Sequence, residues 1–391
     1  MIKLIKSTFY KEEEVKKELA EFIVNSKQLS IGPECQKFEK TFAKWQGRKS
    51  CVMVNSGSSA NLAIIQALLN LGKLKRGDNV GFSAVTWSTN VMPLIELGLS
   101  PVPIDIELDT LNVSSNKLLE ALRSHDLKAL FLTNLLGFCD DIDQIKKICK
   151  EKRIMLIEDN CESLGTVYKG QKLGNYGIAS TFSFYVGHHL STIEGGAVCT
   201  DNSELETMLQ MVRAHGWDRN LTERKQLRIR LKNNVNSSFY SRYTFYDLGY
   251  NLRTTEVNGF IGNKQLEYID EMNEKRKNNF LKMAESIYSI KEKYYPMKYS
   301  HLDFISNFAF PVVCKSQKIR DELVEKCKER VEIRPIVGGD MVFQPFFRKY
   351  VTNNYSENSN AKLVHEQGLY FGNNPEMTDE EVEEVLGIFI K

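Results

Sequence analysis

The most informative stretch of this chain is Ser183-Phe184-Tyr185-Val186-Gly187-His188-His189-Leu190-Ser191-Thr192-Ile193-Glu194-Gly195-Gly196. It begins within an expected strand, Thr181–Tyr185, and leads into a second, Ala197–Thr200. Two adjacent histidines lie in the connecting loop. A lone histidine is usually a structural residue, but an imidazole titrates near neutral pH and can therefore move protons.

Short β-rich runs alternate with helical segments on both sides of this loop, from about residue 50 to 200. The expected strands are Cys51–Val54, Asn79–Phe82, Pro101–Ile106, Ala129–Thr133, Ile154–Ile157, Thr181–Tyr185 and Ala197–Thr200. Alternation of this kind predicts an α/β domain with a mainly parallel, helix-covered sheet. Ligands of such sheets bind outside the carboxyl ends of the strands.

The pattern changes after about residue 265. A charged helix from Gln265 to about Tyr288 is followed by a strand at Phe308–Val313, a helix at Lys318–Arg330 and a capped helix after Thr378. We therefore expect a large α/β domain with an N-terminal segment at residues 1–265. A smaller α+β domain is expected at residues 266–391.

Composition limits the classes of partner. The 391 residues include 52 basic and 50 acidic side chains, so neither nucleic acid nor a membrane is an expected partner. The one basic run, Arg224–Lys232, is expected to be a solvated loop or helix face, with a phosphate-bearing substrate as the alternative. The eight cysteines form no C-x-x-C pair, and the start of the chain does not read as a signal peptide. We therefore expect reduced thiols in a cytoplasmic protein without a membrane span.

An anion site is expected where Asn55-Ser56-Gly57-Ser58-Ser59-Ala60 joins a strand to a helix. Glycine permits close backbone approach, and a helix amino terminus with hydroxyl groups suits a phosphate. A plain turn is the simpler interpretation of these residues taken alone.

Two further segments carry candidate binding residues. Ile157-Glu158-Asp159-Asn160-Cys161-Glu162 ends an apolar strand with acidic residues, and Ala84-Val85-Thr86-Trp87 follows another strand with a large ring. Considered separately, an aspartate at a strand end more often caps a helix, and a tryptophan more often belongs to the core.

Together these segments resemble the sugar aminotransferases of the DegT/DnrJ/EryC1/StrS family. The resemblance extends from about residue 28 to 265, and more loosely to the end, with Leu248-Gly249-Tyr250-Asn251-Leu252-Arg253 as a further landmark. It implies the aspartate aminotransferase fold (fold type I) and pyridoxal 5'-phosphate (PLP) as cofactor. It also implies a homodimer whose subunits share their active sites.

The resemblance assigns roles residue by residue. Asp159 would hold the pyridine nitrogen, Trp87 would stack on the ring, and Glu162 would lie beside it. The phosphate would bind to Gly57, Ser58, Ser59 and Ser183, with Asn251 and Arg253 reaching the partner's cofactor. His215 either approaches the active site or is structural.

At His188 the chain departs from the family, which has lysine there. A lysine amine forms a Schiff base with the cofactor aldehyde and an imidazole cannot. Members with histidine at this position resemble sugar 3-dehydratases, which act on nucleotide-linked 4-keto-6-deoxyhexoses; an acidic residue at Glu162 fits this group. The resemblance then implies untethered PLP, converted to pyridoxamine phosphate (PMP) by an amino donor such as glutamate. His188 would serve as the acid and base that removes the C3 hydroxyl.

A subgroup of these dehydratases carries an iron–sulfur cluster, with cysteines after a His-Gly-Trp segment. Here no cysteine follows His215–Arg219 until Cys314, so we expect neither a cluster nor another metal. Two alternatives stay open at this point. One is a nucleotide-sugar aminotransferase that works without a lysine, and the other is a non-catalytic PLP-fold protein that binds or regulates a partner.

Overall fold

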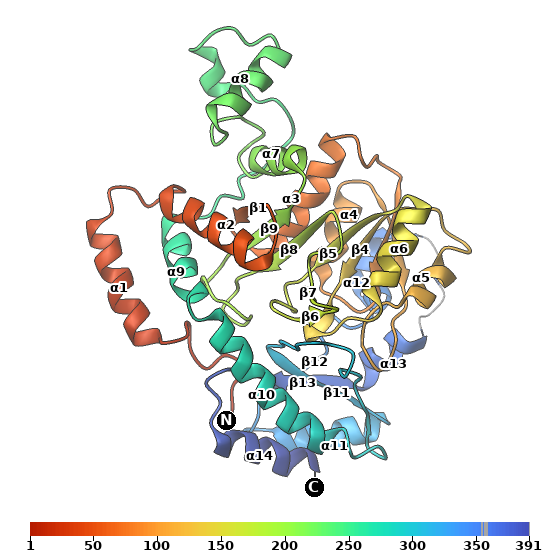
Figure 1. The fold of residues 1–391 in the computed structure, drawn as a ribbon. Helices are drawn as coiled ribbons and strands as arrows, with labels where there is room; N and C mark the ends of the chain where they lie inside the picture. Colours follow the sequence, from red (N-terminus) through yellow and green to blue (C-terminus); the bar gives the residue numbers. More distant parts are fainter. Residues whose placement is uncertain (353–354, 356–358, 391) are drawn as a thin grey trace.

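A seven-stranded sheet forms the larger half of the molecule in the computed structural model, which describes residues 1–352, 355 and 359–390 (Figure 1). Its strands are β1 (Ser50–Val54), β2 (Asn79–Ser83), β3 (Ser100–Ile104), β4 (Leu127–Thr133), β5 (Met155–Asp159), β8 (Ala179–Ser183) and β9 (Gly196–Thr200). The spatial order is β1-β9-β8-β5-β4-β2-β3. Only β9 runs antiparallel to its neighbours, which confirms the predicted mainly parallel α/β fold.

Helices cover both faces of this sheet, which explains why its strands are almost wholly buried. Phe131 and Ile157 pack under α3, α4 and α7, whereas Leu130 and Leu156 pack toward α5 and α6. The helices of this half are α1 (Glu12–Asn25), α2 (Pro33–Gln46), α3 (Gly57–Asn70), α4 (Met92–Glu96), α5 (Ser115–Ala121), α6 (Ile142–Lys152), α7 (Ser203–Val212), α8 (Glu223–Lys232) and α9 (Glu256–Leu266).

A second, four-stranded sheet lies below the first in Figure 1, in the order β10-β11-β13-β12. Its strands are β10 (Tyr294–Tyr295), β11 (Ala309–Cys314), β12 (Ile333–Pro335) and β13 (Gly368–Gly372). The helices that accompany it are α10 (Ile269–Ile287), α11 (Gln317–Cys327), α13 (Ser359–Gln367) and α14 (Asp379–Ile390), whereas α12 (Pro345–Tyr350) packs on the large sheet through Phe347. The amino-terminal segment joins this half, since Ile2 bridges to Val331 and the Leu4 amide donates to Glu332.

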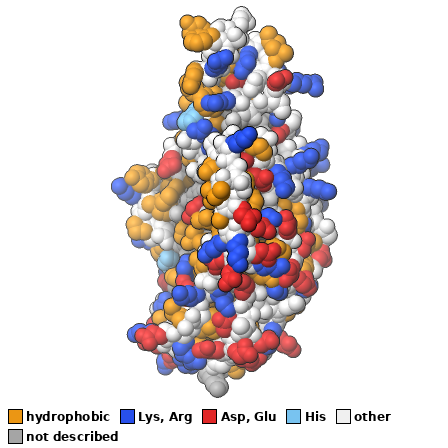
Figure 2. All heavy atoms as spheres, turned by 90° about the vertical axis from the view of Figure 1, so that its left-hand side faces the viewer, with side chains coloured by type: hydrophobic (Ala, Val, Ile, Leu, Met, Phe, Trp, Pro, Cys, Tyr) orange, Lys and Arg blue, Asp and Glu red, His pale blue; other side chains and the backbone are white. Residues whose placement is uncertain are grey.

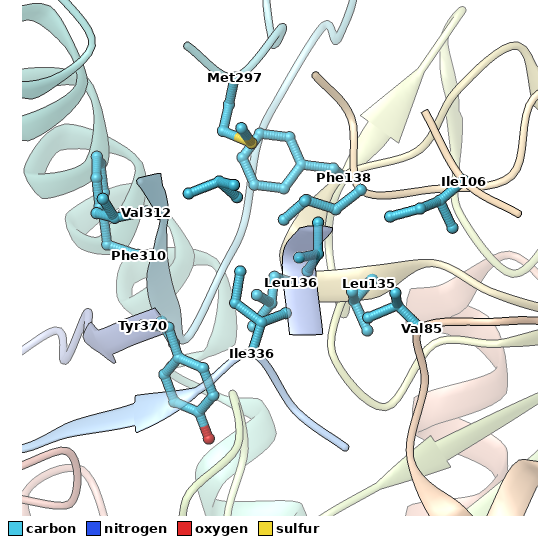
Figure 3. Packing of buried hydrophobic residues seen from close by; sticks show 14 of the residues in the cluster. Val85, Ile106, Leu135, Leu136, Phe138, Met297, Phe310, Val312, Ile336 and Tyr370 are labelled. Carbon is cyan, nitrogen blue, oxygen red and sulfur yellow. The ribbon is translucent and has the colours of Figure 1, made fainter. Parts of the chain in front are cut away.

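One hydrophobic cluster connects the two sheets. Figure 3 shows Leu135 and Phe138 of the large half packed with Phe310 and Ile336 of the small half. The second sheet is thus held close to the carboxyl ends of the first. A division into two domains at residue 265 stays a prediction.

Most expected elements occur near their predicted positions. The expected helix from Gln265 is broken, because α9 ends at Leu266 and α10 begins at Ile269. The basic run forms α8, a helix without buried residues on an arm that projects from the body (Figure 1). In the part of the chain that the structure describes, no helix is long and apolar enough to cross a membrane.

Candidate active site

His188 lies in the loop between β8 and β9, and backbone hydrogen bonds fix the shape of that loop. Phe184 N donates to Gly195 O (2.8 Å), Thr192 N donates to Phe184 O (2.8 Å), and His188 N donates to Tyr185 O (2.9 Å). The His188 ring lies between Tyr185 and Phe308, with ring centroids 5.8 and 5.0 Å away. Its position is therefore set by aromatic contacts from both halves of the molecule.

Burial makes the His188 imidazole neutral. It lowers the pKa of His188 to about 4, against a smaller opposite effect from the nearby Asp159 carboxylate. The Nδ1 atom is buried without a hydrogen-bond partner in the described residues, and His188 lines the cavity, so we expect a ligand to meet the ring at Nε2. The neutral ring is a base with a free lone pair.

Asp159 ends β5, where the register places it level with Thr133 of β4 and Thr181 of β8. Its Oδ2 accepts from Asn61 Nδ2 (3.0 Å) and Asn90 Nδ2 (2.7 Å), and its Oδ1 accepts from the Cys161 amide (2.9 Å). These three donors fix the carboxylate in a buried position. Sequence reasoning missed both asparagines, although each is a polar residue in an apolar context.

The amino terminus of α3 meets the end of β8 at very short range. A Cβ atom on Gly57 would lie 2.6 Å from the Ser183 Cβ, so only glycine fits there. Ser58 and Ser183 line the cavity. Ser59 does not line it; its amide donates to the Ser56 Oγ and its own hydroxyl donates to Asn55 Oδ1.

Glu162 is buried and faces the same cavity. Its Oε2 accepts from the Leu136 amide (3.1 Å), and Leu136 adopts a positive φ of 51° in doing so. Burial raises the pKa of Glu162 to about 8, so its carboxyl is protonated at neutral pH. It can then donate a hydrogen bond, which an ionised carboxylate cannot.

A cavity of about 410 Å³ brings most of the predicted residues together. The predicted residues that line it are Gly57, Ser58, Trp87, Asp159, Glu162, Ser183 and His188. Trp87 is 55 % exposed, so it borders the cavity and does not belong to the core. Phe308, Arg334 and Tyr370 also line the cavity and were missed, since they come from the second sheet and no local pattern marks them.

Besides Ser59, three predicted residues lie outside this cavity. His215 packs its ring against Trp217 (5.4 Å), Asn251 pairs with Ala214, and Arg253 Nε donates to Asn251 Oδ1 (2.9 Å). This placement agrees with the expectation that Asn251 and Arg253 serve a partner subunit. Their roles, like that of His215, stay predictions.

Known proteins resemble this chain in sequence and in fold. Residues 10–389 match the model of the DegT/DnrJ/EryC1/StrS aminotransferase family. The chain belongs to this family. It is 36 % identical to GDP-4-keto-6-deoxy-D-mannose 3-dehydratase of Yersinia pseudotuberculosis over 375 residues, which cover 94 % of each protein.

Solved structures of DegT/DnrJ/EryC1/StrS proteins agree with the fold. A GDP-4-keto-6-deoxymannose-3-dehydratase with a trapped PLP-glutamate geminal diamine has a TM-score of 0.89 and 31 % identity, with full coverage of both chains. A variant of that enzyme with bound GDP-perosamine also has a TM-score of 0.89, at 30 % identity and full coverage. The predicted fold type I architecture is thereby confirmed.

Proposed function

We propose that this protein is a PLP- and PMP-dependent nucleotide-sugar 3-dehydratase. It would remove the C3 hydroxyl of a nucleotide-linked 4-keto-6-deoxyhexose, with glutamate as amino donor. The observation that carries the proposal is His188, an imidazole at the family's lysine position, in a cavity that no described lysine lines. The names of the two similar dehydratases support the same reaction.

The residues present fit the cofactor. The fixed Asp159 carboxylate suits a protonated pyridine nitrogen, and the α3 amino terminus at Gly57 and Ser58 lines the cavity and suits a phosphate. Trp87 offers a ring at the border of the cavity. When bound, the cofactor supplies the electron sink that permits loss of the C3 hydroxyl.

His188 would move the protons. Its neutral ring accepts a proton at Nε2 first, and the resulting imidazolium then donates that proton to the C3 oxygen, which leaves as water. Because burial lowers the pKa of this ring, its protonated form is a stronger acid than an ordinary imidazolium. Glu162 can hold a neighbouring oxygen by donating a hydrogen bond, while Tyr185 and Phe308 limit the access of water to the ring.

We also propose a cytoplasmic homodimer with shared active sites. Asn251 and Arg253 lie outside the cavity of their own chain, as residues that serve a partner would. Hydrophobic side chains are visible near the top of Figure 2. The exposed apolar side chains on the arm around α8 are Leu227, Leu231, Phe239, Tyr240 and Tyr243. An exposed apolar surface of this kind favours a protein partner.

Product analysis tests the reaction. The protein is incubated with PLP, glutamate and a panel of GDP-, CDP-, UDP- and dTDP-linked 4-keto-6-deoxyhexoses, and the products are weighed by mass spectrometry. Released ammonia with a sugar deoxygenated at C3 supports the proposal. An amino sugar would show the lysine-less aminotransferase instead, and no conversion together with no PLP binding would show a non-catalytic protein.

A further inference from the structure

One cationic side chain among the described residues lines the active-site cavity, and the reaction above gives it no role. Arg334 lies on β12 at the border of the cavity, with its side chain 44 % exposed. It donates from Nη2 (2.6 Å) and Nε (3.1 Å) to the same oxygen of Glu332, Oε1. The other oxygen of Glu332 accepts from the Leu4 amide (3.0 Å), so the carboxylate that holds Arg334 is itself fixed.

The second sheet places Arg334 on the wall of the cavity, away from His188. Arg334 is paired with Tyr370 across β12 and β13, and both side chains line the cavity. Tyr370 contacts Phe308 (6.3 Å between ring centroids), and Phe308 contacts His188 (5.0 Å). Figure 3 shows the Tyr370 hydroxyl pointing away from the hydrophobic cluster. Two aromatic rings thus separate the guanidinium from the imidazole.

The α3 amino terminus and Arg334 each provide positive charge, at two separate places in the cavity. The α3 amino terminus at Gly57 attracts one phosphate, which the proposed function assigns to the cofactor. A cavity of about 410 Å³ that holds the cofactor and a hexose leaves a linked nucleoside diphosphate at the border. The diphosphate of such a substrate is carried on the C1 oxygen, so a sugar with C3 at His188 would need an anion-binding group elsewhere on the cavity wall, and Arg334 is the cation there among the described residues.

We infer that Arg334 binds the diphosphate of the nucleotide-sugar substrate and so selects nucleotide-linked sugars over free sugars. A guanidinium has five N–H donors, so donors remain on Arg334 besides those that face Glu332 and the Tyr370 hydroxyl. A guanidinium also matches phosphate oxygens in geometry and charge. This inference rests on the proposed function. The carboxylate of the amino donor is the competing anion, and the experiment separates the two.

The test compares wild type, Arg334→Gln and Arg334→Lys. Arg330→Gln is the matched control, because Arg330 is also exposed and paired with a glutamate (Glu384) but does not line the cavity. Three quantities are measured: KM and kcat for the nucleotide sugar, the inhibition constant of GDP (with UDP, CDP and dTDP in parallel), and the rate at which glutamate alone converts bound PLP to PMP.

For Arg334→Gln we expect KM and the inhibition constant of the preferred nucleoside diphosphate to rise about tenfold, because one charge-assisted hydrogen bond is lost. The value of kcat and the glutamate step should stay within about twofold of wild type, with Arg334→Lys between the two. Slower glutamate conversion with unchanged nucleotide inhibition would overturn the inference in favour of the donor carboxylate; no change in either would also overturn it. Binding of nucleoside diphosphates by calorimetry separates this inference from a failure of the dehydratase proposal, since it needs no turnover.

Discussion

The residue at position 188 determines whether the cofactor can be covalently attached, and the sequence alone shows that this residue is histidine. The sequence does not show how acidic the imidazole is. Burial between Tyr185 and Phe308 sets that property, and Phe308 lies 120 positions further along the chain, on the second sheet's side of the cavity. The sequence therefore predicts that an imidazole serves as acid and base. The pKa of that imidazole follows only from the packing around it.

The first prediction concerns the pH dependence of turnover. Because the pKa of His188 is lowered to about 4, the neutral base persists well below the usual histidine range. The value of kcat/KM should be flat on the acid side down to about pH 5 and fall as pH approaches 4. An acid limb centred near 6.5 would show a solvated ring and contradict the buried geometry.

The second prediction concerns Glu162 and stability. Its pKa in the folded chain, about 8, lies above the ordinary value of 4.5, so the folded chain binds a proton that the unfolded chain releases. Stability from this group is complete below about pH 4.5 and is lost as pH rises through 8. Between pH 6 and 8.5 the melting temperature of wild type should therefore fall more than that of Glu162→Gln, by about 3 °C.

Glu285→Gln serves as the control for this measurement, because Glu285 is exposed on α10. Parallel melting curves of wild type and Glu162→Gln across pH 6–8.5 would be inconsistent with a protonated carboxyl at this site.

Among the elements, the strands of the large sheet follow from the sequence because each is a short apolar run between turn residues. All seven expected strands occur, whereas β6 (Val167–Tyr168) and β7 (Gln171–Lys172) are too short to leave a pattern. The break between α9 and α10 was also missed, since the charged helical texture continues through it. Phe308, Arg334 and Tyr370 could not be assigned, because their place in the site depends on how the second sheet packs.

The third prediction concerns the junction of β8 and α3. Gly57→Ala places a Cβ 2.6 Å from Ser183 and 3.2 Å from the Cys161 Sγ, so the helix start must shift. We expect a loss of about 1–3 kcal/mol in the free energy of unfolding and at least about tenfold weaker PLP binding. Both are measurable, by denaturant titration and by PLP absorbance.

The matched control is Gly387→Ala in α14, where an added Cβ meets no atom within 4 Å. Alanine should there stabilise the helix by up to about 1 kcal/mol. If Gly57→Ala were as harmless as this control, the close contact would have no role in shaping the phosphate site.

The fourth prediction concerns the assembly of two chains and tests whether the subunits of the proposed homodimer share their active sites. His188→Asn and Arg253→Ala should each be inactive as homodimers. If Arg253 serves the partner's cavity, a heterodimer of the two variants contains one intact site, and its activity should be about half that of wild type. The heterodimer is purified from co-expressed chains with different tags. An inactive heterodimer would place Arg253 in its own chain's site and contradict the proposed assembly.

The most direct test of the account is whether PLP is covalently attached. PLP-loaded protein is reduced with borohydride, digested, and its peptides are weighed; His188→Lys is the positive control. We predict that no cavity peptide of the wild type carries a reduced cofactor, while the control carries it at position 188. A reduced cofactor on any cavity residue of the wild type would contradict the central claim that an imidazole works beside an untethered cofactor.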